Sequence, residues 1–267
     1  MQTFEIKNDR KVADDRRDFQ GMKLPPATIE TTMLAIRLHA PGGPTNLEYE
    51  QIDTPRPGTG EALVRIYAAA ITRDELKWPV ARLPAIPSYE FSGIVVALGS
   101  EADDLKIGDA VYALSGFDHD GAAAEYAVVP KQFLAPKPRT LDHIECAAIP
   151  LAALAAWQGL FDHGGLQKGQ RVLIHGAAGG VGSYAVQLAH HHGAHVVGTA
   201  SANNVQTVRD LGADQVIDHT RSRFEDAIEP VDLVFDTVGG DRLRRSPAVL
   251  RAGGHRSRRM GEASLAA

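Results

Sequence analysis

An apolar strand that enters a glycine-rich turn and leaves it as an amphipathic helix constrains this chain more than any other segment. The strand covers residues 172–175, the glycines lie within 176–182, and the helix continues to residue 189. This order gathers backbone N–H groups and a helix N-terminus at one point, where a pyrophosphate can bind. A glycine fingerprint alone is weak evidence, but here a strand precedes it and a helix follows it. The segment therefore predicts a dinucleotide-binding site.

Three positions of this turn match the fingerprint G-x-G-x-x-G. They are Ala177, Gly179 and Gly182, so alanine replaces the first glycine. Glycine at the second position lets the backbone approach a phosphate closely, and glycine at the third lets the helix pack on the strand. The alternative is a tight strand-to-helix turn without a ligand. We predict cofactor contacts at Ala178, Gly179, Gly180, Val181 and Gly182.

The pattern beyond residue 171 alternates between strands and helices. Apolar strands are expected at 171–175, 195–199, 215–218 and 231–236, with helices at 181–192, 203–211, near 222–227 and at 241–250. Strands separated by helices of this length form a parallel sheet that is covered on both faces. This part of the chain is therefore predicted to be a doubly wound α/β domain.

The part of the chain before this domain has a different character. Residues 1–31 are polar and lack periodicity, which favours a flexible extension. From 32 to about 138, short apolar runs alternate with Gly, Pro and Asp, which is typical of a small β-barrel with irregular loops. An alanine-rich helical bridge follows at 141–160. We expect a flexible extension over 1–31, a substrate domain with the bridge over 32–158, and a nucleotide-binding domain over 159–267.

Composition excludes several classes of function. The 267 residues are 44% hydrophobic and 23% charged, as in an ordinary globular protein. The net charge of −5 gives no reason to expect nucleic acid or an anionic membrane as a partner. No apolar run approaches the ~18 residues that a membrane span needs. We therefore expect a small-molecule substrate, with no nucleic acid and no membrane.

The single cysteine, Cys146, limits the chemistry further. One cysteine forms no intrachain disulfide and no four-cysteine zinc site. Its apolar helical context favours a packed side chain over a nucleophile. Residues 1–21 carry acidic side chains and lack an apolar core, so they read as neither a signal nor a transit peptide. The default expectation is a cytoplasmic location.

The end of the second strand indicates which cofactor is preferred. An enzyme for NADH places Asp or Glu there to hold the ribose 2′-OH, whereas this chain has Ala200 followed by Ser201. Without a carboxylate nothing repels a 2′-phosphate, so NADPH is favoured. The end of the fourth strand adds Thr237, Val238 and Gly239 as expected cofactor neighbours, with a loop of no function as the alternative.

Several segments together resemble the medium-chain dehydrogenase/reductase superfamily, and within it the zinc-free quinone oxidoreductase branch. The resemblance covers residues 33 to about 254. It implies a GroES-like barrel on the substrate side joined to a Rossmann domain, with the cofactor in the cleft between them. The segments that carry it are Pro87–Gly93, Gly99, Gly108–Asp109, Gly121–Pro130, Pro150–Trp157, Ala177–Gly182, Gly212–Asp218 and Asp236–Gly240.

The metal ligands of the superfamily's zinc enzymes are replaced here. Those enzymes carry Gly-His-Glu and cysteine ligands, whereas this chain reads Ser88-Tyr89-Glu90 and has Arg73 near the first cysteine position. Tyrosine is a poor zinc ligand and no thiolate lies nearby, so we expect no metal. The run His190–His192 on the fingerprint helix is interpreted as a solvated helix end.

Without a Lewis acid, alcohol oxidation loses its means of stabilising the alkoxide. A quinone or an α,β-unsaturated carbonyl accepts hydride from NADPH when the two are held close and aligned, and the proton can come from solvent. The resemblance implies the same substrates. The chain is thus expected to be an NADPH-dependent quinone or enone oxidoreductase.

Candidate substrate-pocket residues are few. They are Thr72 and Tyr89, with Asp74 and Trp78 beside them. The hydroxyl of Tyr89 can donate a hydrogen bond to a carbonyl oxygen, although a buried structural tyrosine is an equal alternative. Glu90 has a counterpart in the superfamily whose role is mainly structural. No residue is assigned as the general acid, so the catalytic residues are left unknown.

Two substitutions depart from the family near the cofactor. Ala155 stands where relatives often have threonine, and Asn203 replaces the lysine that usually holds the 2′-phosphate. The second change loses a charge-assisted contact of about 1.5–3 kcal/mol. Ser201, together with His219 where relatives have tyrosine, is then expected to hold the phosphate.

The residues after Gly254 are the largest departure. Relatives continue with an apolar strand, but residues 255–259 are His-Arg-Ser-Arg-Arg. A central parallel strand cannot be built from such residues, because burying unpaired charges costs too much. We expect the sheet to stop after four strands, as in a truncated or frame-shifted member, with an incomplete nicotinamide end. A homodimer is a further expectation, although the sheet edge through which relatives dimerise is then missing. The alternative function is a truncated, catalytically impaired relative that binds NADPH.

Overall fold

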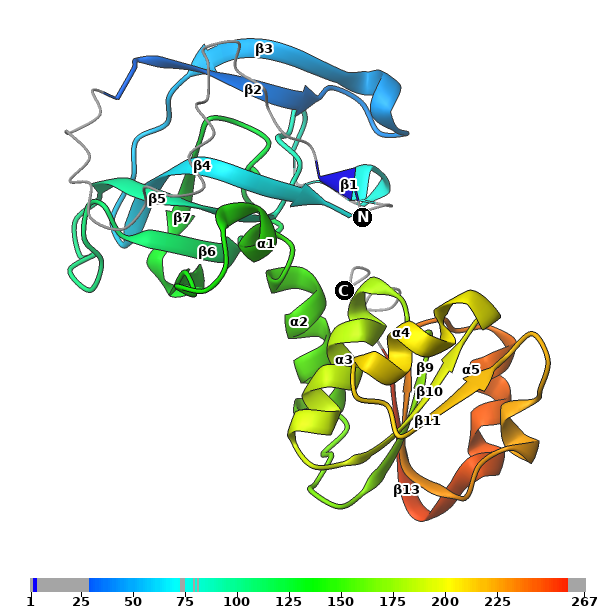
Figure 1. The fold of residues 1–267 in the computed structure, drawn as a ribbon. Coiled ribbons are helices and arrows are strands. Elements are labelled where there is room, and N and C mark those ends of the chain that lie inside the picture. The colour runs from blue at the N-terminus through cyan, green and yellow to red at the C-terminus, as the bar shows by residue number, and fades with distance from the viewer. Residues whose placement is uncertain (1, 4–28, 73–74, 79, 81, 259–267) are drawn as a thin grey trace. The chain divides into compact units, whose positions relative to one another are not determined.

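The computed structural model describes residues 2–3, 29–72, 75–78, 80 and 82–258, and the chain divides into two compact units, 1–150 and 151–267 (Figure 1). Most of the expected N-terminal extension lies outside the described residues. From it, the two residues of β1 (Gln2–Thr3) pair antiparallel with Ala70 and Ile71 of β4. The expected domain limits after residues 31 and 158 stay predictions. Within the described ranges, no helix is both long and apolar enough to cross a membrane.

The first unit is built from antiparallel strands. One sheet runs in the order β1-β4-β5-β6-β8, and β7 also pairs with β4, while β2 and β3 form a separate hairpin. A bridge between Ala35 and Ala124 ties the hairpin to the rest of the unit. The strands are β2 (Thr32–Leu38), β3 (Leu47–Asp53), β4 (Glu61–Ile71), β5 (Glu90–Leu98), β6 (Ala110–Leu114), β7 (Tyr126–Pro130) and β8 (Leu134–Pro136).

The core of the first unit lies on both faces of β4. Val64 packs in a cluster around Phe91, whereas Leu63 faces a second cluster that contains Met33 of the hairpin. Successive side chains of a strand point to opposite faces. Burial of both faces is what the expected barrel requires, and the sequence did not predict the two-residue β1, the polar β3 or the three-residue β8.

Helices connect and cover the strands. Helix α1 (His143–Ala147) starts with a capping box, in which the Asp142 carboxylate accepts the Glu145 N–H at 2.8 Å and the Glu145 carboxylate accepts the Asp142 N–H at 2.9 Å. Helix α2 (Pro150–Trp157) continues into the π-helical turn η4 (Gln158–Asp162). The other helices are α3 (Gly180–His191), α4 (Val205–Asp210) and α5 (Asp241–Arg245). Short 3-10 turns are η1 (Pro44–Asn46), η2 (Glu75–Lys77), η3 (Lys131–Phe133), η5 (Ala202–Asn204), η6 (Phe224–Asp226) and η7 (Ser246–Val249).

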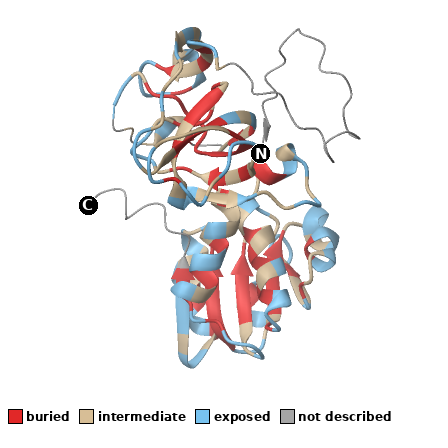
Figure 2. Ribbon diagram, turned by 90° about the vertical axis from the view of Figure 1, so that its left-hand side faces the viewer, coloured by how far each residue is buried: buried red, intermediate tan, exposed pale blue. Residues whose placement is uncertain are grey.

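The second unit contains a parallel sheet in the order β11-β10-β9-β12-β13. Its strands are β9 (Arg171–His175), β10 (His195–Ala200), β11 (Gln215–Asp218), β12 (Val231–Asp236) and β13 (Leu250–Arg258). Alternate residues of β9 join different cores, Ile174 on one face of the sheet and Leu173 on the other. Figure 2 shows these central strands buried between more exposed helices. The chain returns from β11 to β12 across β9, so the switch point of the sheet lies between β9 and β12.

The fifth strand corrects the expectation that the sheet stops after four. β13 pairs in parallel with β12, with Leu233 opposite His255 and Phe235 opposite Ser257. It is an edge strand, so only one of its sides meets another strand. His255 and Arg256 are exposed, while Ser257 is buried. The argument against burying charges holds for a central strand, but at an edge these side chains stay in water.

Candidate functional site

The glycine turn at the end of β9 is packed as the fingerprint predicts. A Cβ on Gly182 would lie 2.1 Å from the carbonyl oxygen of Gly176, so only glycine lets α3 approach the turn this closely. Gly176 has φ +69°, and a Cβ there would lie 2.6 Å from Thr237 Oγ1. The strand, the turn and the helix are therefore held together by contacts that exclude side chains.

The start of α3 has the features of an anion site. Gly179 is its N-cap residue and no side chain caps the helix. Gly179 and Gly180 are exposed, and no atom lies within 4 Å of a Cβ built on Gly180. The first N–H groups of a helix have no intrahelical acceptor, and the helix dipole adds positive potential there. The residues present thus fit a pyrophosphate group.

The loop after β12 lies against this turn. Thr237 Oγ1 donates to the carbonyl of His175 at 2.7 Å, which ties the two strand ends together. One carboxylate oxygen of Asp236 accepts the N–H groups of Val238 and Gly239 at 2.8 and 3.0 Å. Val238 itself is half exposed. Thr237, Val238 and Gly239 are therefore brought to the switch point as predicted from their place after the strand.

The three polar residues predicted at the ribose end lie around the end of β10. The His219 N–H donates to the carbonyl of Ala200 at 3.1 Å, which places His219 directly beside Ser201. Ser201 Oγ accepts from Asn204 Nδ2 at 3.2 Å, and Asn203 is exposed. Ala200 pairs with Asp218 across the strands.

The carboxylate of Asp218 is turned to its own loop. It accepts the Thr220 hydroxyl at 2.6 Å and the Thr220 N–H at 3.0 Å. These hydrogen bonds, the hydroxyl's first, lower the pKa of Asp218. This carboxylate is therefore already engaged by donors of its own loop.

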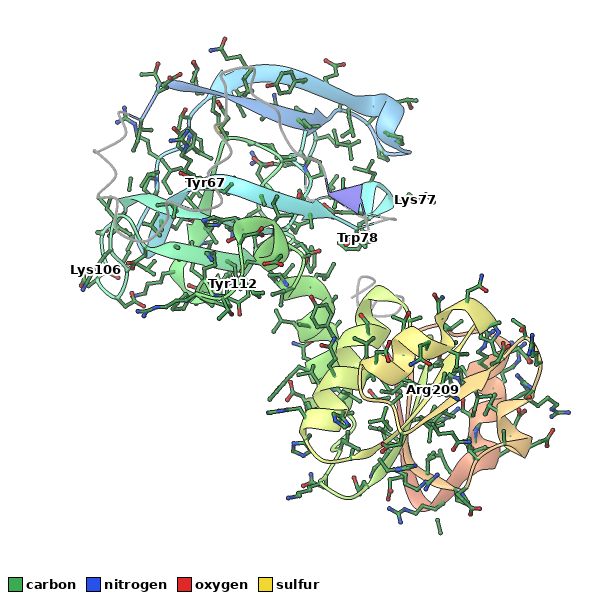
Figure 3. All side chains as sticks on the ribbon, in the orientation of Figure 1. Tyr67, Lys77, Trp78, Lys106, Tyr112 and Arg209 are labelled. Atoms are coloured by element: carbon green, nitrogen blue, oxygen red, sulfur yellow. The ribbon has the colours of Figure 1, made fainter. Side chains whose placement is uncertain are left out.

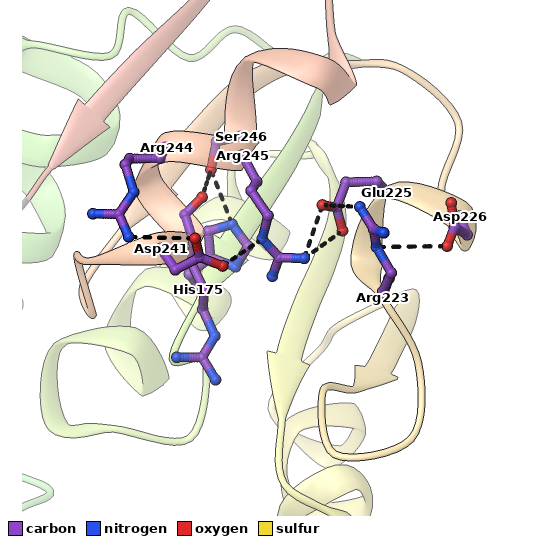
Figure 4. Close-up of polar contacts among 9 residues, drawn as sticks. His175, Arg223, Glu225, Asp226, Asp241, Arg244, Arg245 and Ser246 are labelled. Carbon is purple, nitrogen blue, oxygen red and sulfur yellow. Dashed lines mark hydrogen bonds and ion pairs between the residues drawn. The ribbon is translucent and has the colours of Figure 1, made fainter.

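A buried histidine below the glycine turn was not singled out by the sequence. His175 Nε2 lies 3.2 Å from Ser246 Oγ (Figure 4). Its Nδ1 lies 3.3 Å from Thr199 Oγ1. Because Ser246 Oγ donates its proton to the Arg242 carbonyl at 2.7 Å, it accepts from Nε2–H. Nδ1 then accepts from the Thr199 hydroxyl. Burial lowers the pKa of His175 to about 4, so the ring is neutral near pH 7.

The first unit brings the two candidate pocket residues, Thr72 and Tyr89, together around Glu75. Glu75 is buried and accepts the Thr72 N–H at 2.9 Å and the Ser88 N–H. Burial raises the pKa of Glu75, against these hydrogen bonds. The sequence reading missed Glu75, since its partner Ser88 lies 13 residues away. Glu75 fixes the backbone that carries both candidate residues.

The ring of Tyr89 belongs to an aromatic cluster. Its centroid lies 6.5 Å from that of Trp78 and 5.1 Å from that of Phe117. Figure 3 shows Trp78 beside Lys77 of η2. The ring is buried, but its hydroxyl has no hydrogen-bond partner among the described residues. Burial, followed by the charges of Glu75 and Asp120, raises the pKa of Tyr89, so the hydroxyl is a donor at neutral pH. Arg73 and Asp74 lie outside the described residues.

Two other sequence interpretations concern metal and thiol chemistry. Cys146 is buried, and burial raises the pKa of its thiol, which agrees with a packed side chain. Within the described residues, His39, Glu48 and Glu50 are grouped with ligand atoms within 4.8 Å of one another. Glu50 is 3.0 Å from His39 and 3.1 Å from Arg37, so an ordinary ion-pair network accounts for the group.

The sheet, its switch point and the glycine turn define a Rossmann-type nucleotide-binding domain, which follows an antiparallel unit on the same chain. Comparison with known families is consistent with this. The family model "Alcohol dehydrogenase GroES-like domain" matches residues 58–139, and the model "Zinc-binding dehydrogenase" matches residues 180–257. The chain belongs to the medium-chain dehydrogenase/reductase superfamily, in its zinc-free quinone oxidoreductase branch. The predicted fold class is thereby confirmed.

Relatives that are named as enzymes are similar to this chain over most of its length. The 2-methylene-furan-3-one reductase of Solanum lycopersicum is 38% identical over 67% of this chain and 50% of that protein. The NADPH-dependent alkenal/one oxidoreductase of Arabidopsis thaliana is 38% identical over 74% of this chain and 55% of that protein. The structure of the quinone oxidoreductase from Coxiella burnetii has a TM-score of 0.78 and 34% identity, covering 84% of this chain and 74% of that one. The chain spans between about two fifths and two thirds of the length of the curated relatives it matches.

Proposed function

We propose that this chain binds NADPH and is a zinc-independent oxidoreductase that reduces a quinone or an α,β-unsaturated carbonyl compound. The observation that carries the proposal is the exposed, uncapped start of α3, at Gly179 and Gly180, beside a β10 end without a carboxylate. The first feature suits a pyrophosphate and the second suits a 2′-phosphate. The names of the alkenal/one and quinone oxidoreductase relatives support the same cofactor and acceptors.

The residues of the second unit have separate binding roles in this proposal. The backbone of Ala178 to Gly182 holds the pyrophosphate, and Thr237 to Gly239 form the wall beside it. Ser201, Asn203 and His219 face the ribose. When bound, the cofactor supplies a hydride, which with a proton from solvent completes a two-electron reduction of the acceptor.

In the first unit, the Tyr89 hydroxyl would orient the acceptor by donating a hydrogen bond to its carbonyl oxygen. Such a bond strengthens as the oxygen gains charge, and therefore favours the transition state over the ground state. Trp78 and Phe117 supply flat apolar surface next to Tyr89, which suits a conjugated acceptor. Tyr89 stands at the histidine position of the zinc enzymes, and a neutral phenol there is a poor metal ligand.

The test combines turnover with binding. NADPH absorbance is followed with 1,4-naphthoquinone, 9,10-phenanthrenequinone and a 2-alkenal, and NADPH and NADH binding is measured by calorimetry. We expect turnover of at least one acceptor and tighter binding of NADPH. Binding without turnover would support the alternative of a relative that binds the cofactor only. Absence of binding would refute both.

Location and assembly stay predictions. Curated relatives include chloroplastic and mitochondrial proteins, so the expected cytoplasmic location needs a fractionation experiment. A homodimer is tested by sedimentation.

A further inference from the structure

A cavity of about 520 Å³ lies at the carboxyl ends of β10 and β11, and it is strongly basic. Thr199 of β10 lines it on one side and His219 after β11 on another. Its charged lining consists of four arginines and one carboxylate, contributed by the segment after β11 and by α5: Arg221, Arg223, Arg242, Arg245 and Asp241. A cavity with this excess of positive charge suits a phosphate group.

Two of the four arginines, Arg223 and Arg245, each lie within ion-pair distance of two carboxylates. Arg245 Nη1 lies 2.9 Å from Glu225 and Nε lies 2.8 Å from Asp241 (Figure 4). The guanidinium also lies over the Phe224 ring, 5.0 Å from its centre. Arg223 lies 3.3 Å from the Glu225 carboxylate and 3.8 Å from that of Asp226. These cations shape the cavity wall and carry little unpaired charge.

The other two arginines of the cavity, Arg221 and Arg242, retain unpaired charge. The guanidinium of Arg242 has no hydrogen-bond or ion-pair partner within the described part of the chain, although its side chain is partly buried. Arg221 is 80% exposed and makes one loose contact, with Nε 3.5 Å from Asp218. The cavity thus presents two available guanidinium groups from two different elements.

This cavity borders the nucleotide site proposed above. Thr199 Oγ1 accepts the N–H of Gly176, the first residue of the glycine turn, at 3.3 Å. The hydrogen bond from His219 to Ala200 places the start of the Arg221 segment beside Ser201. A substituent on the adenosine ribose at this strand end therefore lies near the mouth of the cavity.

We propose that Arg221 and Arg242 neutralise the 2′-phosphate of NADPH and so determine the cofactor preference of this chain. They take over the task of the lysine that Asn203 replaces. Each planar guanidinium binds two phosphate oxygens, and its charge is permanent. This inference rests on the proposed function and names residues that the fingerprint does not contain.

The test measures nucleotide binding alone, with 2′,5′-ADP and 5′-AMP as probes in calorimetry. Arg221→Ala and Arg242→Ala should each weaken the binding of 2′,5′-ADP by about tenfold, as expected for the loss of one charged contact. The affinity for 5′-AMP should change by less than about twofold. The double variant should bind 2′,5′-ADP about a hundredfold more weakly than the wild type. Added salt should reduce the preference for 2′,5′-ADP over 5′-AMP more in the wild type than in the double variant.

The matched control is Arg244→Ala. Arg244 belongs to the same helix, is 74% exposed, contacts Asp241 at 3.4 Å and does not line the cavity. The Arg244→Ala variant should keep the full preference for 2′,5′-ADP over 5′-AMP. Binding of 5′-AMP shows that each variant is folded.

The outcomes separate the two proposals. If the double variant keeps the wild-type preference, this inference is wrong and the NADPH assignment stands. If the wild type binds both probes equally, the preference for a 2′-phosphate is wrong and this inference fails with it. If the wild type binds neither, the nucleotide site itself is refuted.

Discussion

His175 makes the second unit sensitive to acid, and we predict that its stability falls as the pH drops from about 6.5 to 4. The side chain is completely buried and its pKa is lowered to about 4, mainly by burial. In the unfolded chain a histidine titrates near 6.5. Between these values the unfolded chain binds a proton that the folded chain does not. The stability is therefore fully present above about pH 6.5 and is lost as the pH falls.

The size of this effect follows from the pKa shift. A shift from 6.5 to about 4 corresponds to roughly 3 kcal/mol once both states are protonated, and about 2 kcal/mol of it is already lost at pH 5. The geometry gives the reason. Nδ1 accepts from the Thr199 hydroxyl, which in turn accepts the Gly176 N–H. A proton on Nδ1 removes the acceptor of the Thr199 hydroxyl, whose O–H must then turn away, and it leaves a positive charge buried below the glycine turn.

Urea unfolding of wild type and His175→Asn at pH 7 and pH 5 measures the effect. In a Trp78→Phe background, Trp157 is the remaining tryptophan and reports on the unit 151–267. Between pH 7 and pH 5, the free energy of unfolding should fall by about 2 kcal/mol more in the wild type than in His175→Asn. His191→Asn, at an exposed position of α3, should behave as the wild type does. Equal losses in wild type and His175→Asn would refute the assignment of the buried neutral ring.

Substitutions at three further positions test the site. Gly180→Asp should weaken NADPH binding by more than about a hundredfold, because it puts a carboxylate at the pyrophosphate position, whereas Gly180→Ala should fold normally in the open space there; calorimetry that finds equal binding in both would contradict the turn assignment. Gly182→Ala should lower the melting temperature by several degrees, since its Cβ meets the Gly176 carbonyl oxygen at 2.1 Å. An unchanged melting curve argues against that packing. Tyr89→Phe should reduce kcat/KM about tenfold to a hundredfold without loss of stability, as its hydroxyl has no partner among the described residues; unchanged turnover would remove Tyr89 from the site.

Local patterns predicted much of the second unit. The limits of β9, β11 and β12 agree with the sequence, because each is a short apolar run bounded by turn residues. The helix expected over 241–250 ends at Arg245 and continues as the 3-10 turn η7. Pro247 explains the break, since it lacks the N–H that a continuing helix needs.

The parts that were not predicted depend on contacts between distant segments. The basic cavity joins α5 to the loop after β11, about 20 residues earlier in the chain, so no local motif shows it. The edge position of β13 depends on sheet order, and a sequence pattern does not reveal whether a strand is central or peripheral. The neutral state of His175 likewise depends on side chains from β10 and η7.

The charged edge strand also affects how copies of this chain meet in solution. Among the described residues, no strand pairs with the outer side of β13, so its backbone N–H and C=O groups form an open row there. Such a row pairs readily with another strand. If two copies joined there in antiparallel fashion, the exposed His255 and Arg256 of each would lie close to basic side chains of the other. Like charges placed across neighbouring strands repel each other. The same residues that make β13 unsuitable for the middle of a sheet thus discourage the sheet from adding a sixth strand by self-association.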